Sequence, residues 1–259
     1  MKNFVTSLLV LITIQVHGQY YQIIHVKGEI SKTASGELLK PGDRLMEDEE
    51  ITFKSPEAMA AALNPEKGRF IIRADSGQEN TVDIIYILKS TITPVRGGMS
   101  TRAAGINNAF DLKVYFAEAT YVWAGNEIFL PVSRSAFPLD ESNYFFLRYQ
   151  YKGEEINKKV GTEANALLMK QEDVFRVDDK EINPFDVSDY ELFYYQSEAE
   201  ESTLIAEIDF VLISQEVLGT VYKAFETTSK YPYNDVADMF SDMYGKCDPV
   251  QVRYNLQDK

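Results

Sequence analysis

Histidine and cysteine are scarce in this sequence, and their scarcity argues against several kinds of catalytic chemistry. The 259 residues include two histidines and one cysteine. Serine and cysteine triads need a histidine base, and zinc sites usually need several histidine or cysteine ligands. His17 lies in the N-terminal segment described below, so His25 is the one imidazole of the mature chain. Since His25 is out of phase with the apolar Ile24 and Val26, we expect it to face solvent rather than to act as a base.

The single cysteine excludes an intrachain disulfide. Cys247 follows the end of a predicted helix and has no histidine nearby in the sequence, so we interpret it as a structural thiol and not as a nucleophile. An exported protein without disulfides depends on its apolar core for stability. A chain of 259 residues is long enough to form two or three domains with such cores.

Beyond its N-terminus the sequence lacks an apolar run long enough to cross a bilayer. The N-terminus has the pattern of a secretory signal: Lys2 gives a positive start, residues 8–14 are apolar, and Val16 and Gly18 form a small-residue cleavage site. We therefore predict that residues 1–18 are a signal peptide and that the protein is exported. We expect no membrane span once this signal is removed.

Basic residues are outnumbered by acidic ones. Lysine and arginine number 26 against 40 aspartate and glutamate, which gives a formal net charge of −14, and losing Lys2 with the signal peptide makes it −15. An acidic surface repels phosphate backbones and anionic lipids. We therefore expect no nucleic-acid partner.

The N-terminal part of the mature chain consists of short β-strand patterns separated by turn residues. The strands expected here are 20–30, 51–53, 58–63 and 69–73. Turn signals recur about every ten residues, a spacing typical of a β-sandwich or barrel-like unit. Residues 82–89 are ambiguous between strand and helix, and we favour a helix capped by Asn80. These patterns predict a first β-domain at 20–92.

Parts of this stretch resemble the FecR-type β-domain, named for the ferric-citrate regulator. The matching segments are 26–30 (VKGEI), 39–45 (LKPGDRL), 51–55 (ITFKS), 58–63 (AMAAAL) and 68–70 (GRF). The resemblance implies an envelope-facing binding or signal-transducing module without catalytic residues. Signal-transducing members carry a cytoplasmic segment and a membrane span before this domain. Because only a short export signal precedes it here, we do not expect a sigma-regulating role.

The remainder is predicted to be a linker, a second β-domain and a helical end. Residues 93–109 contain three glycines and one proline with little periodicity, so we interpret them as a linker. Alternation resumes at 110, with strands expected at 110–116, 121–130, 144–151, 154–160, 167–169, 174–177, 190–195 and 204–213. Residues 144–160 form a hairpin with Gly153 at its tip. We predict a sandwich-like second domain at 110–213.

The period changes to that of helices after residue 213. Ser214 is a suitable N-cap for a first amphipathic helix, and a second helix is expected to begin at Asn234 and to end at Gly245. We predict that residues 214–259 pack on the second β-domain. The fold class is therefore mainly β with a C-terminal helical pair.

Carboxylates are abundant but form no catalytic or metal-binding pattern. The acidic runs at 47–50, 178–179 and 198–201 are typical of solvated loops. The acidic residues between 173 and 189 lack the alternating spacing of a calcium loop, and residues 96–98 lack the lysine and helix start of a phosphate loop. We therefore assign no catalytic, cofactor-binding or metal-binding residues and expect no cofactor.

Aromatic residues are the remaining candidates for a functional surface. The 16 tyrosines and 15 phenylalanines suit strands. Tyr121, Trp123, Tyr190 and Tyr194 are our candidates for a protein-binding or carbohydrate-stacking surface. The alternative interpretation, which we favour, is that these rings pack in the core, because half of any aromatic strand faces inward.

Together these features suggest a non-catalytic, exported binding or adaptor protein in the periplasm or at the surface of a Gram-negative cell, acting through protein contacts. One alternative is a glycan hydrolase using aspartate and glutamate, or a carbohydrate-binding protein. Another is a structural subunit of an envelope assembly, which would carry an exposed apolar patch or a long unpaired edge strand.

Overall fold

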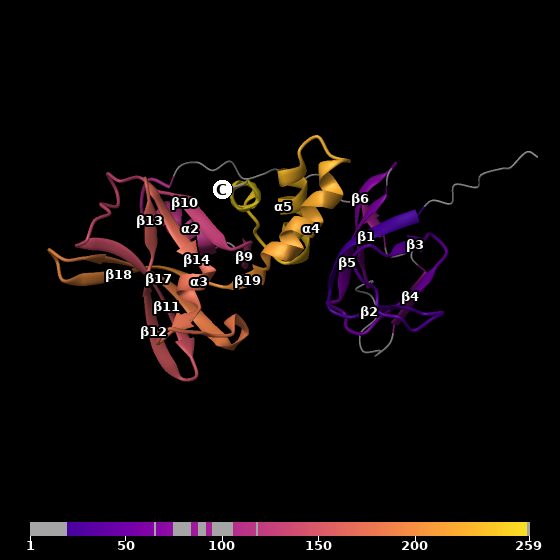
Figure 1. The fold of residues 1–259 in the computed structure, drawn as a ribbon, viewed down its shortest axis with the longest axis horizontal. Helices are drawn as coiled ribbons and strands as arrows, with labels where there is room; N and C mark the ends of the chain where they lie inside the picture. The colour runs from indigo at the N-terminus through magenta and orange to yellow at the C-terminus, as the bar shows by residue number, and fades with distance from the viewer. Residues whose placement is uncertain are drawn as a thin grey trace, which may run out of the picture.

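The computed structural model describes residues 20–64, 66–74, 84–87, 92–94, 106–117 and 119–257. The predicted signal peptide at 1–18 lies outside the described residues, as does 95–105 of the predicted linker. The chain forms an N-terminal β unit (20–94), a second β unit (106–213) and C-terminal helices (215–256) that lie between the two β units (Figure 1). The protein is mainly β with helices at its C-terminal end, as predicted.

The N-terminal β unit contains two antiparallel sheets around one apolar core. The first sheet has the order β3 (Arg44–Met46), β1 (Tyr20–Lys27), β5 (Met59–Asn64), β6 (Gly68–Arg73) and β8 (Ile92–Pro94). The second has the order β2 (Ile30–Lys32), β4 (Glu50–Phe53) and β7 (Ile84–Ile87). Ile30, Leu45, Phe53 and Ile72 are among the residues that fill the core between them.

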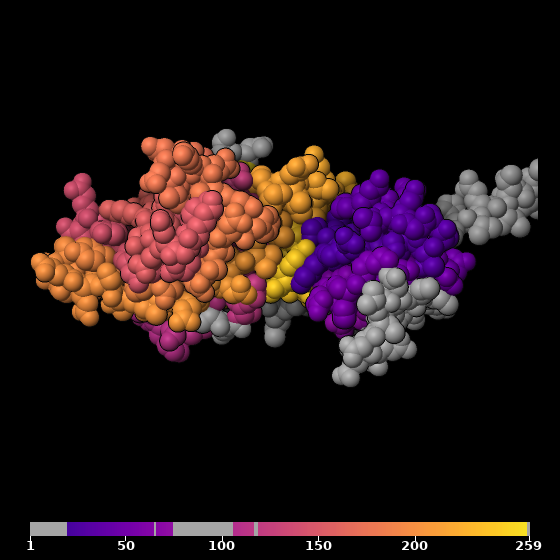
Figure 2. Space-filling view, turned by 90° about the horizontal axis from the view of Figure 1, so that it is seen from below, coloured from indigo at the N-terminus to yellow at the C-terminus, as the bar shows by residue number. Residues whose placement is uncertain are grey.

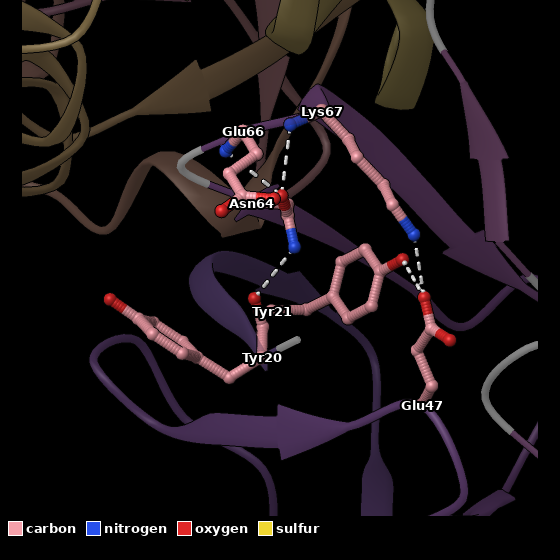
Figure 3. Close-up of polar contacts among 6 residues, drawn as sticks. All are labelled: Tyr20, Tyr21, Glu47, Asn64, Glu66 and Lys67. Carbon is pink, nitrogen blue, oxygen red and sulfur yellow. Dashed lines mark hydrogen bonds and ion pairs between the residues drawn. The ribbon is translucent and has the colours of Figure 1, made fainter. Parts of the chain in front are cut away.

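The turn between β5 and β6 is fixed by Asn64. Its side-chain oxygen accepts hydrogen bonds from the backbone N–H groups of Glu66 and Lys67, and its amide donates to the carbonyl of Tyr20 (Figure 3). Beside it, the Tyr21 hydroxyl and the Lys67 ammonium both bond the Glu47 carboxylate, at 3.1 and 2.7 Å. Asn64 therefore ties the β5–β6 turn to β1, and Glu47, just after β3, ties to both through Tyr21 and Lys67.

Two expectations for this region are wrong at the residues the structure describes. The helix favoured at 82–89 is instead strand β7 at Ile84–Ile87, which pairs with β4 along its whole length. A short apolar run is compatible with the periodicity of a helix or of a strand. Here it forms a strand because it pairs with the edge of β4. The predicted linker, moreover, begins inside strand β8, which pairs with β6.

The second β unit is built from a four-stranded and a three-stranded antiparallel sheet. The four-stranded sheet has the order β12 (Glu154–Lys159), β11 (Asn143–Tyr151), β17 (Val187–Gln196) and β18 (Glu201–Ile208). The three-stranded sheet has the order β10 (Glu127–Pro131), β14 (Ala166–Lys170) and β13 (Gly161–Glu163). Residues from both sheets belong to one hydrophobic cluster, as in a sandwich.

Smaller elements complete this unit. They are α2 (Ala109–Ala117), β9 (Tyr121–Ala124), α3 (Gln171–Val174), β15 (Arg176–Val177), β16 (Lys180–Glu181), η1 (Pro184–Asp186) and β19 (Phe210–Ile213). The hairpin predicted at 144–160 is confirmed: β11 and β12 pair, and Lys152 and Gly153 both have positive φ at its tip. Positive φ at both positions is the geometry of the two-residue turn that suits strand twist.

The strand predicted at 110–116 is wrong, since this segment is helix α2. Asn108 caps it by accepting a hydrogen bond from the backbone N–H of Asp111. Leu112 and Phe116 are fully buried. These two residues are spaced i and i+4, so the apolar positions that suggested alternation fit a helical face equally well.

The strand predicted at 204–213 is broken at Asp209. Strand β18 ends at Ile208 on β17, and β19 then pairs in parallel with β9. The Asp209 carboxylate accepts from the hydroxyl of Thr120 at 2.6 Å, and its carbonyl accepts from the N–H of Tyr121. The chain thus changes sheets at Asp209.

The predicted helical pair is present, and a third helix follows it. Helix α4 (Gln215–Glu226) is capped by Ser214 as predicted, and α5 (Pro232–Met243) begins two residues before Asn234 with a proline in its first turn. The unpredicted α6 (Pro249–Leu256) is capped by Asp248. Only two of its eight residues are buried, so the sequence gives it little helical periodicity.

The C-terminal helices pack on both β units, and not on the second alone as expected. One hydrophobic cluster joins Phe225 and Phe240 of the helices with Ile24 and Ile71 of the N-terminal β unit and with Val122 of the second. Figure 2 shows the C-terminal residues in yellow directly against the N-terminal β unit in indigo. In the described residues, no helix is both long and apolar enough to cross a membrane.

Candidate binding surface

The four aromatic residues predicted to form a binding surface are buried. Tyr121 and Trp123 on β9 are 0% exposed, and Tyr190 and Tyr194 on β17 are at most 7% exposed. The Tyr194 hydroxyl donates to the carbonyl of Pro138 at 2.7 Å, and burial raises the pKa of this phenol. The predicted surface is therefore wrong, and the alternative interpretation, core packing, describes these rings.

Three aromatic residues on the opposite face of the same sheet are half-buried and reach the surface, and a fourth, Phe193, is buried beneath Arg148. They are Tyr144 and Phe146 on β11, and Phe193 and Tyr195 on β17, and we call this set the outer aromatic face. Tyr144 pairs with Tyr195 across the strands, and Phe146 pairs with Phe193. The two phenylalanine rings stack at 5.1 Å with an interplanar angle of 5°, and the two tyrosine rings lie 5.1 Å apart at 40°.

Two cations lie on the rings of the outer aromatic face. The guanidinium of Arg148 is 4.3 Å from the ring centre of Phe193, and the ammonium of Lys159 is 4.2 Å from that of Tyr144. Both distances are within the range of a cation–π interaction. The rings and the cations thus form one continuous surface patch.

The charge of Arg148 is compensated by neighbouring groups, whereas that of Lys159 is not. Arg148 forms ion pairs with Glu155 at 3.3 Å and with Glu191 at 3.9 Å, and it donates to the Asn157 side chain. Lys159 is exposed and forms no ion pair with any described residue. It contributes only the smallest effect to the lowered pKa of Asp140, which is due mainly to a hydrogen bond from the Asn143 side chain.

A shallow groove of about 410 Å³ runs over this patch. It is lined by Tyr144, Phe146, Arg148, Asn157, Lys159, Tyr195 and Ser202. These residues come from all four strands of the sheet, so the groove crosses the strands. Its lining contains rings, amide and hydroxyl groups and two cations, and neither a carboxylate nor a histidine. It offers stacking and hydrogen bonding but no general base.

The phase of charged residues along the strands indicates this face in the sequence. On β11, Arg148 and Gln150 are in phase with Tyr144 and Phe146, and on β17 Glu191 is in phase with Phe193 and Tyr195. Charged residues mark the solvent face of a sheet, because a buried unpaired charge is costly. This phase relation indicates which aromatic residues lie outside.

Four carboxylates surround a second hollow on the same sheet. A cavity of about 750 Å³ between β17 and β18–β19 is lined by Asp189, Glu191, Glu207 and Asp209 among others. None of the four is buried, and Glu191 and Asp209 already bind Arg148 and Thr120. A glycosidase needs one acid in an apolar environment, which these side chains do not have.

In the described part of the chain, no group of three or more acidic, histidine or cysteine side chains has the geometry of a metal site.

The expectation that His25 faces solvent is wrong. Its Nε2 lies 2.6 Å from the hydroxyl of Tyr244, and its ring contacts Phe240 edge-on. Burial lowers the pKa of this imidazole to about 4. The C-terminal helices cover this face of β1, and the sequence alone did not place them there.

Cys247 is buried as a structural thiol should be. Burial is the main reason that its pKa is raised, and the nearby Asp248 carboxylate raises it further. A protonated, inaccessible thiol is a poor nucleophile.

A scan against models of known protein families finds no match, and a search of curated proteins finds no relative.

Proposed function

We propose that this protein is a non-catalytic binding or adaptor protein of the bacterial envelope, exported to the periplasm or cell surface, and that its outer aromatic face contacts a partner protein. The observation that carries the proposal is the groove over Tyr144, Tyr195 and Arg148. Tyrosine and arginine are the residue types that dominate the energetics of protein interfaces. The FecR-type resemblance of the N-terminal stretch adds an argument by analogy.

The arrangement of the cations favours a protein over a sugar as the ligand. Arg148 and Lys159 lie over the rings of Phe193 and Tyr144, where a sugar ring would have to stack. The aliphatic stems of these cations and the ring edges between them make a mixed surface of the kind found at protein interfaces.

The experiment is crosslinking capture from the envelope of the source cell with the tagged, exported protein. We expect one stoichiometric envelope protein, and we expect the double variant Tyr144→Ala/Tyr195→Ala to lose it. The matched control is Tyr231→Ala, which removes an exposed tyrosine from the connection between α4 and α5. Equal recovery with the double variant would contradict the proposal.

A carbohydrate is the second candidate ligand, favoured by the direction of the groove. Because the groove crosses four strands, it can accommodate an extended chain laid over the sheet. A glycan array with the wild type and the Tyr144→Ala/Tyr195→Ala variant tests it. Binding of one glycan class that the variant loses would replace the protein partner in this proposal.

A further inference from the structure

The charged side chains that line the groove over the outer aromatic face are opposite in sign to the net charge of the protein. The chain carries a formal charge of −14. The two ionisable side chains that line the groove, apart from the tyrosines, are both cations, Arg148 and Lys159. A cation in such a groove favours anionic ligands where no carboxylate already neutralises it.

Lys159 is the cation available to a ligand. Glu155 and Glu191 neutralise Arg148 and hold it against Phe193. Lys159 interacts weakly with Asp140, whose carboxylate already accepts hydrogen bonds from the N–H groups of Ser142 and Asn143 and from the Asn143 side chain. Lys159 therefore retains an unpaired charge at the end of the groove.

The position of Lys159 links this charge to a ring surface. Its ammonium lies over Tyr144, and Tyr144 pairs with Tyr195 on the next strand. A ligand that brings a carboxylate to Lys159 consequently brings its adjacent groups toward Tyr195, whose ring lies 5.1 Å from that of Tyr144. Ring stacking on tyrosine and a charge-assisted hydrogen bond then act on one short segment.

We propose that the groove recognises an acidic, aromatic peptide segment of the partner, with a carboxylate bound by Lys159 and an aromatic side chain on Tyr195, beside the Tyr144 ring that Lys159 covers. The inference rests on the proposed function and specifies the chemistry of the partner. It predicts selectivity for anionic over cationic ligands at a surface that belongs to an acidic protein.

Fluorescence polarisation with three labelled octapeptides tests this, using the full mature chain. The peptides alternate tyrosine with glutamate, with glutamine or with lysine, so they share the same rings and differ in charge. We expect the glutamate peptide to bind at least about tenfold more tightly than the lysine peptide, and its binding to weaken as salt is raised. Lys159→Gln should weaken the glutamate peptide about fivefold and leave the glutamine peptide unchanged.

Control variants separate this inference from the proposed function. Lys223→Gln removes the same charge from an exposed position on α4 and should change nothing. Equal affinities for the three peptides, all lost in Tyr144→Ala, would overturn anion selectivity while leaving the aromatic face as the binding surface. Failure of all three peptides to bind would overturn the inference, and the capture experiment then judges the proposed function by itself. Binding of a neutral hexasaccharide without any peptide would overturn it in favour of a glycan.

Discussion

At the scale of single residues, the environment of His25 makes stability depend on pH. Its pKa is lowered from 6.5 to about 4 by burial against the C-terminal helices. The unfolded chain therefore takes up a proton below about pH 6.5, and the folded chain does so only near pH 4. The stability due to neutral His25 is complete above pH 6.5 and is lost as the pH falls toward 4, by up to about 3 kcal/mol.

Chemical denaturation of the wild type and of His25→Phe, at pH 7.5 and at pH 5, measures this effect. We expect the wild type to lose more stability than the variant between these two values. Asp238 and Asp242 act in the opposite direction, because burial raises the pKa of both carboxyls in the folded state. The same pH dependence in both proteins would show that His25 is not the titrating group.

A second prediction concerns Gly245, which lies between α5 and α6 with φ of 140°. A Cβ here would collide with the carbonyl oxygen of Thr120, which accepts a hydrogen bond from the N–H of Lys246. Backbone cannot move aside as a side chain can, so we expect Gly245→Ala to cost more than about 2 kcal/mol of unfolding free energy.

Gly219 is the matched control for this substitution. It lies inside α4 with open space around the position of a Cβ. Gly219→Ala should stabilise the protein by about 0.5–1 kcal/mol through helix propensity. Thermal and denaturant unfolding of the two variants should therefore change in opposite directions, and parallel losses would refute the steric argument.

At the scale of secondary structure, the cap of α4 gives a measurable contribution. The Ser214 hydroxyl accepts from the N–H of Val217 at 3.2 Å. Ser214→Ala should lower the unfolding free energy by about 1 kcal/mol, because it leaves one of the first N–H groups of the helix without its side-chain partner. Thr220→Ala, at an exposed position in the same helix, should be neutral or slightly stabilising. Equal losses in both variants would exclude capping as the cause.

Turn chemistry and capping made several elements predictable from the sequence, while the faces of the strands were not. The hairpin around Gly153 and the start of α4 at Ser214 follow from local residues, and the structure confirms both. On β17, however, Tyr194 and Tyr195 are both aromatic, so alternation alone does not say which faces the core. The predicted binding surface took Tyr190 and Tyr194, which face the core. Glu191 is in phase with Tyr195 and marks the opposite, solvent-facing side of the strand.

Other misses arise from distant partners that no local pattern reveals. Residues 84–87 become a strand because β4 offers them a pairing edge. His25 is buried because a helix more than 200 residues later in the chain covers it. Long-range contacts of this kind override local preference.

At the scale of the whole molecule, Arg69 is a polar link between the N-terminal β unit and the C-terminal helices. Its guanidinium donates to the carbonyl of Asp235 at 2.8 Å and lies 3.5 and 3.9 Å from the carboxylates of Asp242 and Asp238. Its side chain is only 7% exposed. Removing such a cation leaves its acidic partners half-buried and uncompensated.

Arg69→Met should therefore loosen the N-terminal β unit from the rest of the protein. We expect faster hydrogen exchange in β1 and β5 and a first thermal transition at lower temperature, while the second β unit is unaffected. Arg73→Met, at the exposed end of the same strand, is the control. Unchanged exchange in β1 would show that apolar packing alone holds the two parts together.

The apolar cluster that joins the C-terminal helices to both β units also constrains the order in which the protein can fold. Ile24 and Ile71 emerge early from the ribosome, but Val236, Phe240 and Val252, which belong to the same cluster, are among the last residues made. During translation, one side of the first sheet therefore stays uncovered and apolar until the C-terminal helices are made. A chain stopped after residue 213 would leave that side open for good, and a holding chaperone is the natural protector of this interval.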